Sequence, residues 1–357
     1  MKQKICIVLA ILCSVLILGA CEKNSENTDF SRQNDNISQI SDESSSSASK
    51  EIFAMDTYMT ITAYGEKSQE AVDAAVMEIQ RLDKLLSVGN SSSEVCQLNN
   101  SGNIKMSEDI KELMKTSKWI FENTDGAYDI TIYPLMELWG FTKTQQAVPD
   151  QKDIDTILSC CGFEKLKIDN ETLTLGKNQG IDFGGIAKGY TSARIMTIFK
   201  EYGINSGVVS LGGNVQCCGV KTDGSLWRCG ITNPDAPDDT TNLLGVINVR
   251  DKAVITSGGY ERFFEENGQT YHHIMNPKTG YPADSGLRSV TIVSENGTLA
   301  DGLSTACFVM GRDRAVQFWK NNKDQFDMIL MTDKNEIIIT EGIKEAFSSD
   351  MNYEIVD

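Results

Sequence analysis

The first fifty residues contain little that can build a compact core, so a globular fold has to come from the rest of the chain. Lys2 and Lys4 precede an apolar run over residues 5–18. That run is too short to span a bilayer comfortably, and the small residues behind it suit a cleavage site. Residues 22–50 hold nine serines and very few large apolar side chains. They bury too little to offset the entropy of ordering them, so we expect a flexible tether and then one folded domain over residues 51–357.

The end of the apolar run resembles a bacterial lipoprotein signal, because Leu18-Gly19-Ala20 precedes Cys21. The resemblance implies a signal peptide over residues 1–20 and lipidation of Cys21, with palmitate among the attached chains. Residues 21–50 would then be the lipidated cysteine and its tether, with a reach of roughly 30 Å. We expect a cell-membrane protein, lipid-anchored on the extracytoplasmic face. An ordinary signal peptide whose cleavage site happens to precede a cysteine is the alternative.

Charge and histidine content narrow the classes of function. The net charge is −17, from 33 Lys+Arg against 50 Asp+Glu. A nucleic-acid binder needs clustered cations, so no nucleic-acid partner is expected. A small phosphate-bearing ligand remains compatible if backbone amides or a metal hold it. Only His272 and His273 are available for any mechanism that needs histidine.

The ten cysteines do not indicate an orderly disulfide framework. Cys6 and Cys13 leave with the signal and Cys21 takes the lipid, which leaves an odd number with two vicinal pairs: Cys96, Cys160, Cys161, Cys217, Cys218, Cys229 and Cys307. No CxxC pair or Cys/His spacing supports zinc. Buried thiols acting as small apolar groups are favoured, and a disulfide that involves the 217–229 stretch stays open as the alternative.

The order of apolar patterns predicts an α+β fold with mixed sheets and packed helices, because helices and strands alternate without a regular βαβ period. Apolar residues at helical spacing predict helices over residues 69–86 and 107–124. Further helices are expected over residues 152–160, 189–202 and 298–308. Strands are expected over residues 55–64, 207–210, 215–219, 226–231, 245–249, 253–256 and 288–294, with hairpins over 166–175 and 328–340. Residues 87–101 and 126–141 are expected to be loops.

Three segments concentrate residues that can carry chemistry. IDFGGIAKGY over residues 181–190 places two glycines before a helix start, where free backbone amides favour phosphate. YHHIMNPKTGYP over residues 271–282 presents His273 from a turn. ADGLST over residues 300–305 places Asp301 and Thr305 on one helix face, as a hard-cation site requires. Taken singly, a glycine-rich turn, structural histidines and a helix N-cap at Asp301 are the simpler interpretations.

Taken together, ordered blocks from about Phe53 to the C-terminus resemble the FAD:protein FMN transferases, the ApbE-like flavin transferases. The blocks are Met55-Asp56-Thr57, Ser93-Glu94 through Leu98-Asn99, Gly126-Ala127-Tyr128-Asp129-Ile130-Thr131, Asp182 through Tyr190, Leu211-Gly212-Gly213-Asn214, Thr256-Ser257-Gly258, His273 through Pro277 with Thr279-Gly280, and Ala300-Asp301 with Thr305.

The resemblance implies an ApbE-like fold and a magnesium-dependent transfer of FMN from FAD to a threonine hydroxyl of a target flavoprotein, with AMP released. It implies Mg²⁺ ligands at the Gly185 carbonyl, Asp301 and Thr305, and FAD contacts at Met55, Ala127, Tyr128, Asp129, Asp182, Lys188, His273 and Ile274. The implied acceptors are flavoprotein subunits of membrane electron-transport complexes. One departure is the Val88-Gly89-Asn90 stretch, which lacks the aromatic residue that the family often places against the flavin.

The reaction assigns physical roles to these residues. A bound cation neutralises charge on the pyrophosphate, supplemented by Lys188 and backbone amides. The acceptor threonine is a poor nucleophile at neutral pH, and His273 is the expected catalytic base because its ordinary pKa lies near working pH. Two alternatives stay open: an FAD pyrophosphatase that gives FMN and AMP, and a non-catalytic flavin-binding lipoprotein.

Overall fold

The computed structural model describes residues 46–142 and 145–357. Its centre is a nine-stranded sheet of order β1-β2-β6-β7-β10-β13-β14-β15-β17, in which every neighbouring pair is antiparallel except β15 and β17. The strands are β1 (Ser47–Ala54), β2 (Thr57–Tyr64), β6 (Ser206–Leu211), β7 (Asn214–Gly219), β10 (Ala253–Gly258), β13 (Leu287–Ser294), β14 (Asp327–Thr332), β15 (Ile337–Thr340) and β17 (Tyr353–Val356). The expected α+β class is confirmed.

Helices cover one face of this sheet. They are α1 (Ser68–Leu86), α3 (Glu108–Asn123), α6 (Ala187–Glu201), α7 (Gly297–Met310) and α8 (Arg312–Lys320). The main core joins α1, α3, α6, α7 and α8 to sheet residues such as Ala253, Ile255 and Leu330. The neighbouring residues Val254 and Ile329 belong to a second core on the opposite face, as the period of two along a strand requires.

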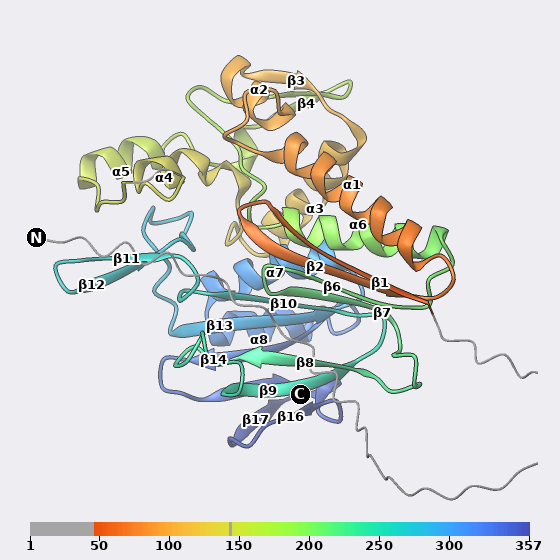
Figure 1. Ribbon diagram of the computed structural model, residues 1–357. Coiled ribbons are helices and arrows are strands. Elements are labelled where there is room, and N and C mark those ends of the chain that lie inside the picture. The colour runs from red at the N-terminus through yellow and green to blue at the C-terminus, as the bar shows by residue number, and fades with distance from the viewer. Residues whose placement is uncertain (1–45, 143–144) are drawn as a thin grey trace, which may run out of the picture.

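The second face carries a small three-stranded sheet of order β16-β9-β8, made of β8 (Trp227–Thr232), β9 (Leu243–Val249) and β16 (Phe347–Ser348). It lies below the main sheet in Figure 1. Trp227, Ile247 and Phe347 fill the second core between the two sheets. The main sheet is therefore sandwiched between helices and a second sheet, with both faces buried.

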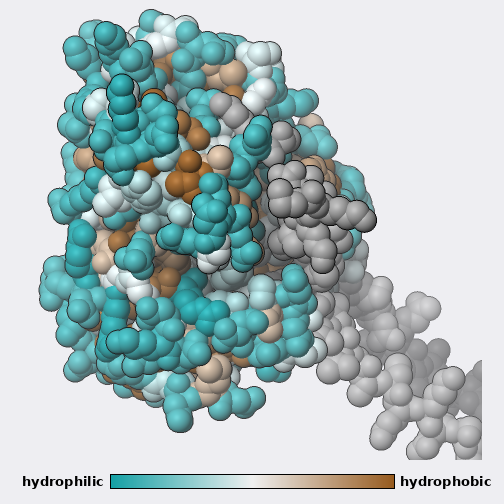
Figure 2. Space-filling view, turned by 90° about the vertical axis from the view of Figure 1, so that its left-hand side faces the viewer, coloured by the Kyte–Doolittle hydropathy of each residue, from teal (hydrophilic) through white to brown (hydrophobic). Residues whose placement is uncertain are grey.

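The remaining α-helices and strands form a rim along the top and the left-hand side of the molecule in Figure 1. They are α2 (Glu94–Ser101), the small sheet of β3 (Asn103–Lys105), β4 (Lys167–Asp169) and β5 (Thr172–Thr174), the helices α4 (Tyr133–Leu138) and α5 (Gln151–Leu158), and the hairpin of β11 (Phe263–Glu266) and β12 (Gln269–His272). Trp139 packs against Phe264, Tyr271 and Tyr281, which ties α4 to the hairpin. The face on which this rim projects is mostly hydrophilic, with apolar patches near its middle (Figure 2).

Several expectations were wrong in detail. Residues 87–101 are not a loop throughout, since Ser93 accepts a hydrogen bond from Cys96 N and caps α2. Residues 126–141 contain α4, which starts beside Pro134. The first strand begins at Ser47, four residues before the expected start of the fold, because Ser47 to Ala54 pair with β2 across the Met55-Asp56 turn. The strands β3, β11, β12, β16 and β17 and the helix α8 were also not expected.

The N-terminal interpretations fall almost entirely outside the described residues. The signal peptide over residues 1–20, the lipidation of Cys21 and most of the tether belong to residues 1–45. Within the described ranges, no helix combines the length and apolarity needed to cross a membrane.

Candidate functional site

The turn that leads into α6 is held from both sides. The Asn99 side chain bonds both backbone groups of Ile181, and Asp182 N donates to Ile130 O at 2.9 Å. The Asp182 carboxylate then accepts from Gly184 N at 2.8 Å. Because these bonds fix the Gly184-Gly185 turn, the backbone before α6 has a defined path toward the site.

The start of α6 crosses α7 at unusually close range. A Cβ on Gly189 would lie 2.2 Å from Gly297 O and 2.5 Å from Asp301 Cβ. Both distances are far below van der Waals contact, so position 189 requires glycine. This packing places Asp301 of α7 directly at the N-terminal turn of α6.

Asp301 is buried and accepts hydrogen bonds at both carboxylate oxygens. Gly189 N donates to Oδ2 at 2.7 Å, and Asn214 Nδ2 donates to Oδ1 at 3.0 Å. Asp301 does not cap its own helix, since α7 begins at Gly297 and Asn296 is its N-cap. No basic side chain in the described ranges forms an ion pair with Asp301. A buried carboxylate without a cationic partner is costly, which suits a site that takes a cation.

Residues around Asp301 offer further oxygen ligands. Thr305 lies one turn along α7, and its hydroxyl is 3.3 Å from Ser257 Oγ, which also bonds Ser304 Oγ at 2.7 Å. A Cβ on Gly185 would lie 3.7 Å from Thr305 Oγ1, so the turn before α6 approaches the same place. No group of three or more His, Cys, Asp or Glu side chains that could hold a metal occurs in the described ranges. Carboxylate, hydroxyl and backbone carbonyl oxygens fit a hard cation that keeps other ligands, as Mg²⁺ does.

The two histidines differ in what their ring nitrogens do. His272 accepts from Ile274 N at Nδ1, and its Nε2 lies 3.1 Å from Ala283 O, so both nitrogens have partners. His273 places Nδ1 at 3.2 Å from the carbonyl of Arg262. A carbonyl only accepts, so this Nδ1 carries the proton and Nε2 is left as the basic nitrogen. His273 is therefore the histidine that is able to take a proton from a ligand.

The positive charges of Arg262 and Lys188 act on the His273 side chain. Desolvation lowers the pKa of His273 to about 3, with the positive charges of Arg262 and Lys188 contributing. Desolvation raises the pKa of Asp182, opposed by Gly184 N, Arg262 and Lys188. His273 is thus neutral at physiological pH, and two cations lie within electrostatic range of it.

Glu261 is a charged residue that its sequence context does not single out. The Glu261 side chain is partly accessible to solvent, and it lines a recess together with Thr256 and Cys229. Desolvation and the negative charge of Asp301 raise its pKa to about 7, while Lys188 opposes the shift. The shared neighbours place Lys188, Glu261 and Asp301 in one electrostatic environment.

The other residues expected to contact FAD differ in their burial and local contacts. Met55 sits in the β1–β2 turn with φ of 49°, and its sulfur accepts from Thr191 Oγ1 of α6 at 3.7 Å. Ile274 and Ala127 are buried. The Tyr128 ring lies against Gly185, since a Cβ there would be 3.1 Å from Tyr128 Cε2. Burial raises the pKa of Tyr128 well above its ordinary value.

Asp129 is committed to local structure. It is buried, and its carboxylate accepts from Thr131 N, Thr131 Oγ1 and Phe163 N at 2.7–3.2 Å. Burial raises the pKa of Asp129 despite these bonds. The Asp129 carboxylate therefore stabilises the chain after α3. A ligand could contact Asp129 only through the lone pairs that these three hydrogen bonds leave free.

Sequence reasoning missed Asn214, Ser257, Glu261 and Arg262 as individual site residues. Asn214 and Ser257 stand within quoted blocks, but their partners Asp301 and Thr305 are 87 and 48 residues away. Glu261 and Arg262 follow β10, which ends at Gly258. Their spacing from other polar residues does not indicate a site. A two-strand hairpin pattern over residues 263–272 was the one available indication that this segment returns to His273.

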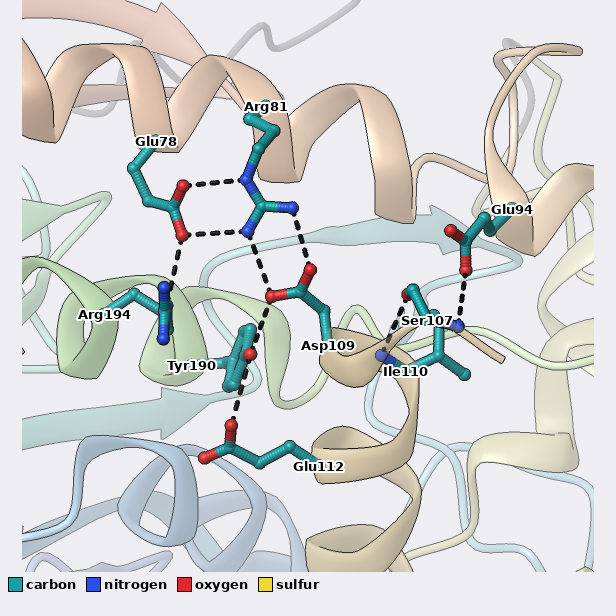
Figure 3. Close-up of polar contacts among 9 residues, drawn as sticks. All are labelled: Glu78, Arg81, Glu94, Ser107, Asp109, Ile110, Glu112, Tyr190 and Arg194. Atoms are coloured by element: carbon teal, nitrogen blue, oxygen red, sulfur yellow. Dashed lines mark hydrogen bonds and ion pairs between the residues drawn. The ribbon is translucent and has the colours of Figure 1, made fainter. Parts of the chain in front are cut away.

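A polar network fixes the three helices that lead into the site (Figure 3). Arg81 of α1 bonds Glu78 and Asp109 at 2.8–3.0 Å, and Glu78 also bonds Arg194 of α6. Tyr190 of α6 donates to Asp109 at 2.8 Å. The network ties α1, α3 and α6 together two residues beyond Lys188.

Comparison with known proteins supports one family. The model of the ApbE family matches residues 55–330. A curated FAD:protein FMN transferase of Klebsiella pneumoniae is 30% identical over 296 residues, which cover 81% of this chain and 91% of the relative. One of Treponema pallidum is 30% identical over 282 residues, covering 72% and 77%.

Solved structures show the same fold. The crystal structure of the ApbE protein from Thermotoga maritima has a TM-score of 0.79 and 32% identity, and the match covers 85% of this chain and all of that one. The apo flavinyl transferase ApbE of Pseudomonas stutzeri has a TM-score of 0.76 and 26% identity, covering 86% and 98%.

Proposed function

The chain belongs to the ApbE family of flavin transferases, and we propose that it transfers FMN from FAD to a threonine hydroxyl of a target flavoprotein, with Mg²⁺ required and AMP released. Flavin transfer is the activity named for its curated relatives. Magnesium, the threonine acceptor and the roles of individual residues are our inferences.

The observation that carries the proposal is a pair of features linked through Lys188, whose charge acts on His273 and, together with that of Asp301, on Glu261. One is the buried Asp301 carboxylate, held by Gly189 and Asn214 with no basic partner in the described ranges. The other is His273, whose Nδ1 bonds a carbonyl and whose Nε2 is left as an acceptor. A cation site and a neutral base are what pyrophosphate cleavage by a hydroxyl requires.

The Gly185 carbonyl, Asp301 and Thr305 would hold the cation. When bound, Mg²⁺ supplies charge that stabilises the pyrophosphate oxygens during phosphoryl transfer. Asn214 and Gly189 orient the Asp301 carboxylate, and Ser257 orients the Thr305 hydroxyl. These contacts predict a preformed cation site.

Lys188 and Arg262 would bind the anionic part of FAD. Both lie within electrostatic range of His273 and Asp182. His273 Nε2 would take the proton of the acceptor hydroxyl, with the Arg262 carbonyl holding the ring in the required tautomer. A bound phosphate beside His273 raises the pKa of the imidazole from its low ligand-free value, because the negative charge favours the protonated ring.

We further propose that the enzyme is anchored by lipid at Cys21 on the extracytoplasmic face of the cell membrane. The small-residue box before Cys21 and the polar segment over residues 22–50 support this. A tether of that length would let the domain reach flavoprotein subunits of membrane electron-transport complexes, the acceptors we propose.

The test incubates the full mature chain with FAD, Mg²⁺ and an acceptor flavoprotein domain, and measures AMP release and covalent flavin fluorescence of the denatured acceptor. We expect both, and expect EDTA to abolish both. An acceptor whose threonine is replaced by alanine is the matched control and stays unlabelled. Stoichiometric AMP and FMN without labelling would identify a pyrophosphatase, and FAD binding without AMP would identify a binding protein; either result contradicts the transferase.

A further inference from the structure

Two buried cysteines from different sheets face each other. Cys217 of β7 and Cys229 of β8 place their Sγ atoms 4.0 Å apart. Both side chains are buried, with 1% and 7% of their surface exposed. Across residues 46–142 and 145–357, no other pair of cysteines that are not neighbours in sequence has its sulfurs this close. The contact therefore singles out one pair among seven cysteines.

The strands that carry the pair belong to opposite layers of the sandwich. β7 is a strand of the nine-stranded sheet, and β8 is the edge strand of the β16-β9-β8 sheet. Cys217 and Cys229 lie in the core between these sheets, with Trp227 and Ile247. The adjacent Cys218 points to the other face of β7, where its sulfur lies 3.3 Å from Ile204 O. Its position makes Cys218 a matched control for Cys217.

We propose that Cys217 and Cys229 form a disulfide that joins the two sheets. A disulfide brings the sulfurs to about 2.05 Å, so the proposal requires the two sulfurs to approach by about 2 Å through rotation about the Cα–Cβ bonds. The bond closes a loop over residues 217–229, whose turn bonds Lys221 N to Ser225 O. Closing this loop removes conformations from the unfolded chain and so stabilises the fold.

The oxidant is a disulfide of the glutathione class or a protein thiol–disulfide oxidoreductase. One cysteine thiolate attacks the external disulfide and releases one thiol, and the second thiolate then displaces the other. Two electrons pass from the cysteines to the oxidant, and the two cysteine protons end on the released thiols. The contact with Cys229 and burial raise the pKa of Cys217 well above its ordinary value. Attack in the folded state is therefore slow, and the bond forms as the chain folds.

The bond would join two strands that line the recess beside Glu261, since Val215 of β7 and Cys229 of β8 both contribute to it. β7 begins at Asn214, which bonds Asp301, and Cys229 lines the recess that also contains Glu261. A link between β7 and β8 would hold these two walls of the recess together. The inference stands on the two sulfurs and does not depend on flavin transfer.

The test refolds the full chain with an excess of oxidised over reduced glutathione. Free thiols are then blocked with one alkylating reagent in denaturant, and a second, isotopically distinct reagent is added after reduction. Peptide mapping should show the second label on Cys217 and Cys229 and the first label on Cys218 and the other described cysteines. First label on both Cys217 and Cys229 would overturn the proposal, and so would second label on a different pair.

Thermal unfolding gives an independent readout. The refolded chain should lose several degrees of thermal midpoint on reduction, and Cys218→Ala should keep that difference. Cys229→Ala should abolish it while remaining folded by circular dichroism. If Cys229→Ala does not fold, hydrogen exchange of the β8 amides in the wild type replaces it: faster exchange after reduction supports the link, and unchanged exchange contradicts it.

Discussion

Asp301 shows how one residue acquires a role through its neighbours. Its carboxylate receives one hydrogen bond from a backbone amide of α6 and one from the Asn214 amide of β7, and no basic partner in the described ranges. Those two donors fix the direction of the remaining lone pairs. The Asp301 side chain therefore does not cap its own helix, because Asn296 is the N-cap of α7.

Replacing Asn214 tests whether that orientation serves a cation. In Asn214→Ala, the Asp301 Oδ1 atom loses its donor, and we expect the apparent affinity for Mg²⁺ to fall by about 10–100-fold. The measurement is the rise in thermal midpoint during titration with Mg²⁺ alone. Gln216→Ala is the control, since Gln216 lies on the same strand but bonds Ser192. An unchanged Mg²⁺ titration in Asn214→Ala would remove Asn214 from the cation site.

The two histidines give a paired prediction. In His273→Gln, no side-chain base remains at Nε2, so we expect covalent flavin transfer to fall by about 10²–10⁴-fold with FAD affinity within a few-fold. In His272→Gln, we expect a lower thermal midpoint and a much smaller loss of rate, because both His272 nitrogens serve local hydrogen bonds. Rate assays with excess FAD distinguish them. Equal losses in both variants would refute the assignment of His273 as base.

At the scale of elements, the site depends on how the four helices α1, α3, α6 and α7 meet. α1 ends before residues 88–90, α3 ends before Ala127 and Tyr128, and α6 starts at Ala187. The Arg81 network joins α1, α3 and α6 side by side (Figure 3). The Gly189–Gly297 crossing sets the separation between α6 and α7. Together these contacts determine where the loops of the candidate site lie.

Removing Arg81 measures what the network contributes. Its partners Glu78 and Asp109 have only 12% and 14% of their side chains exposed. In Arg81→Met, both carboxylates lose hydrogen bonds to a charged donor, and we expect unfolding to become easier by about 1–3 kcal/mol. Urea denaturation measures this. The surface pair Lys50 and Asp73 supplies the control, because solvent screens this pair and Lys50→Met is expected to cost much less stability than Arg81→Met. A similar small cost for Arg81→Met would show that the network adds no stability.

At the scale of the whole molecule, the sheet sandwich brings together segments that are more than a hundred residues apart. The Gly189 and Asp301 contact joins residues 112 positions apart in sequence. The candidate site draws on four kinds of element. Asp182 lies in a turn and Asn214 in a strand, whereas His273 follows a hairpin and Asp301 lies in a helix. The β11–β12 hairpin and α4 then pack through Trp139 and Phe264, which positions the segment that carries His273.

The pH dependence of stability is a property of this assembled state. The folded pKa of His273 is about 3, below its ordinary value of 6.5. Between these values the unfolded chain binds the proton and the folded chain does not, so stability falls as pH falls from about 6.5 to about 3. Below that window the loss stops. His272 contributes in the same direction, since burial lowers its pKa.

Comparing wild type with His273→Gln isolates this contribution, because the acidic groups titrate in both. As the pH falls from 6.5 to 3, we expect the urea midpoint of the wild type to fall more than that of His273→Gln. Parallel midpoints over the whole range would show that His273 titrates alike in the folded and unfolded chain.

The local elements were largely predictable because their causes are local. Apolar spacing located α1, α3, α5, α6 and α7 to within two residues, and alternation located most strands of the main sheet. It failed at α2 and α4, which are short and depend on a serine cap and on packing around Trp139. It also failed at β16 and β17, whose pairing partners supply the order that their sequences lack, and it missed β11 and β12 although residues 263–272 carry a hairpin pattern.

By itself, the sequence determined which reactive and ligating groups the protein has. They are one histidine pair, a glycine turn before a helix, and Asp301 with Thr305 one helical turn apart. Their resemblance to a known family and the α+β class came from the same residues. Tertiary structure alone decided which groups face each other. It placed Asn214 and Gly189 on Asp301, Arg262 on His273, and Cys217 against Cys229. Such contacts depend on backbone paths through the whole fold, and the spacing of residues along a chain carries no information about them.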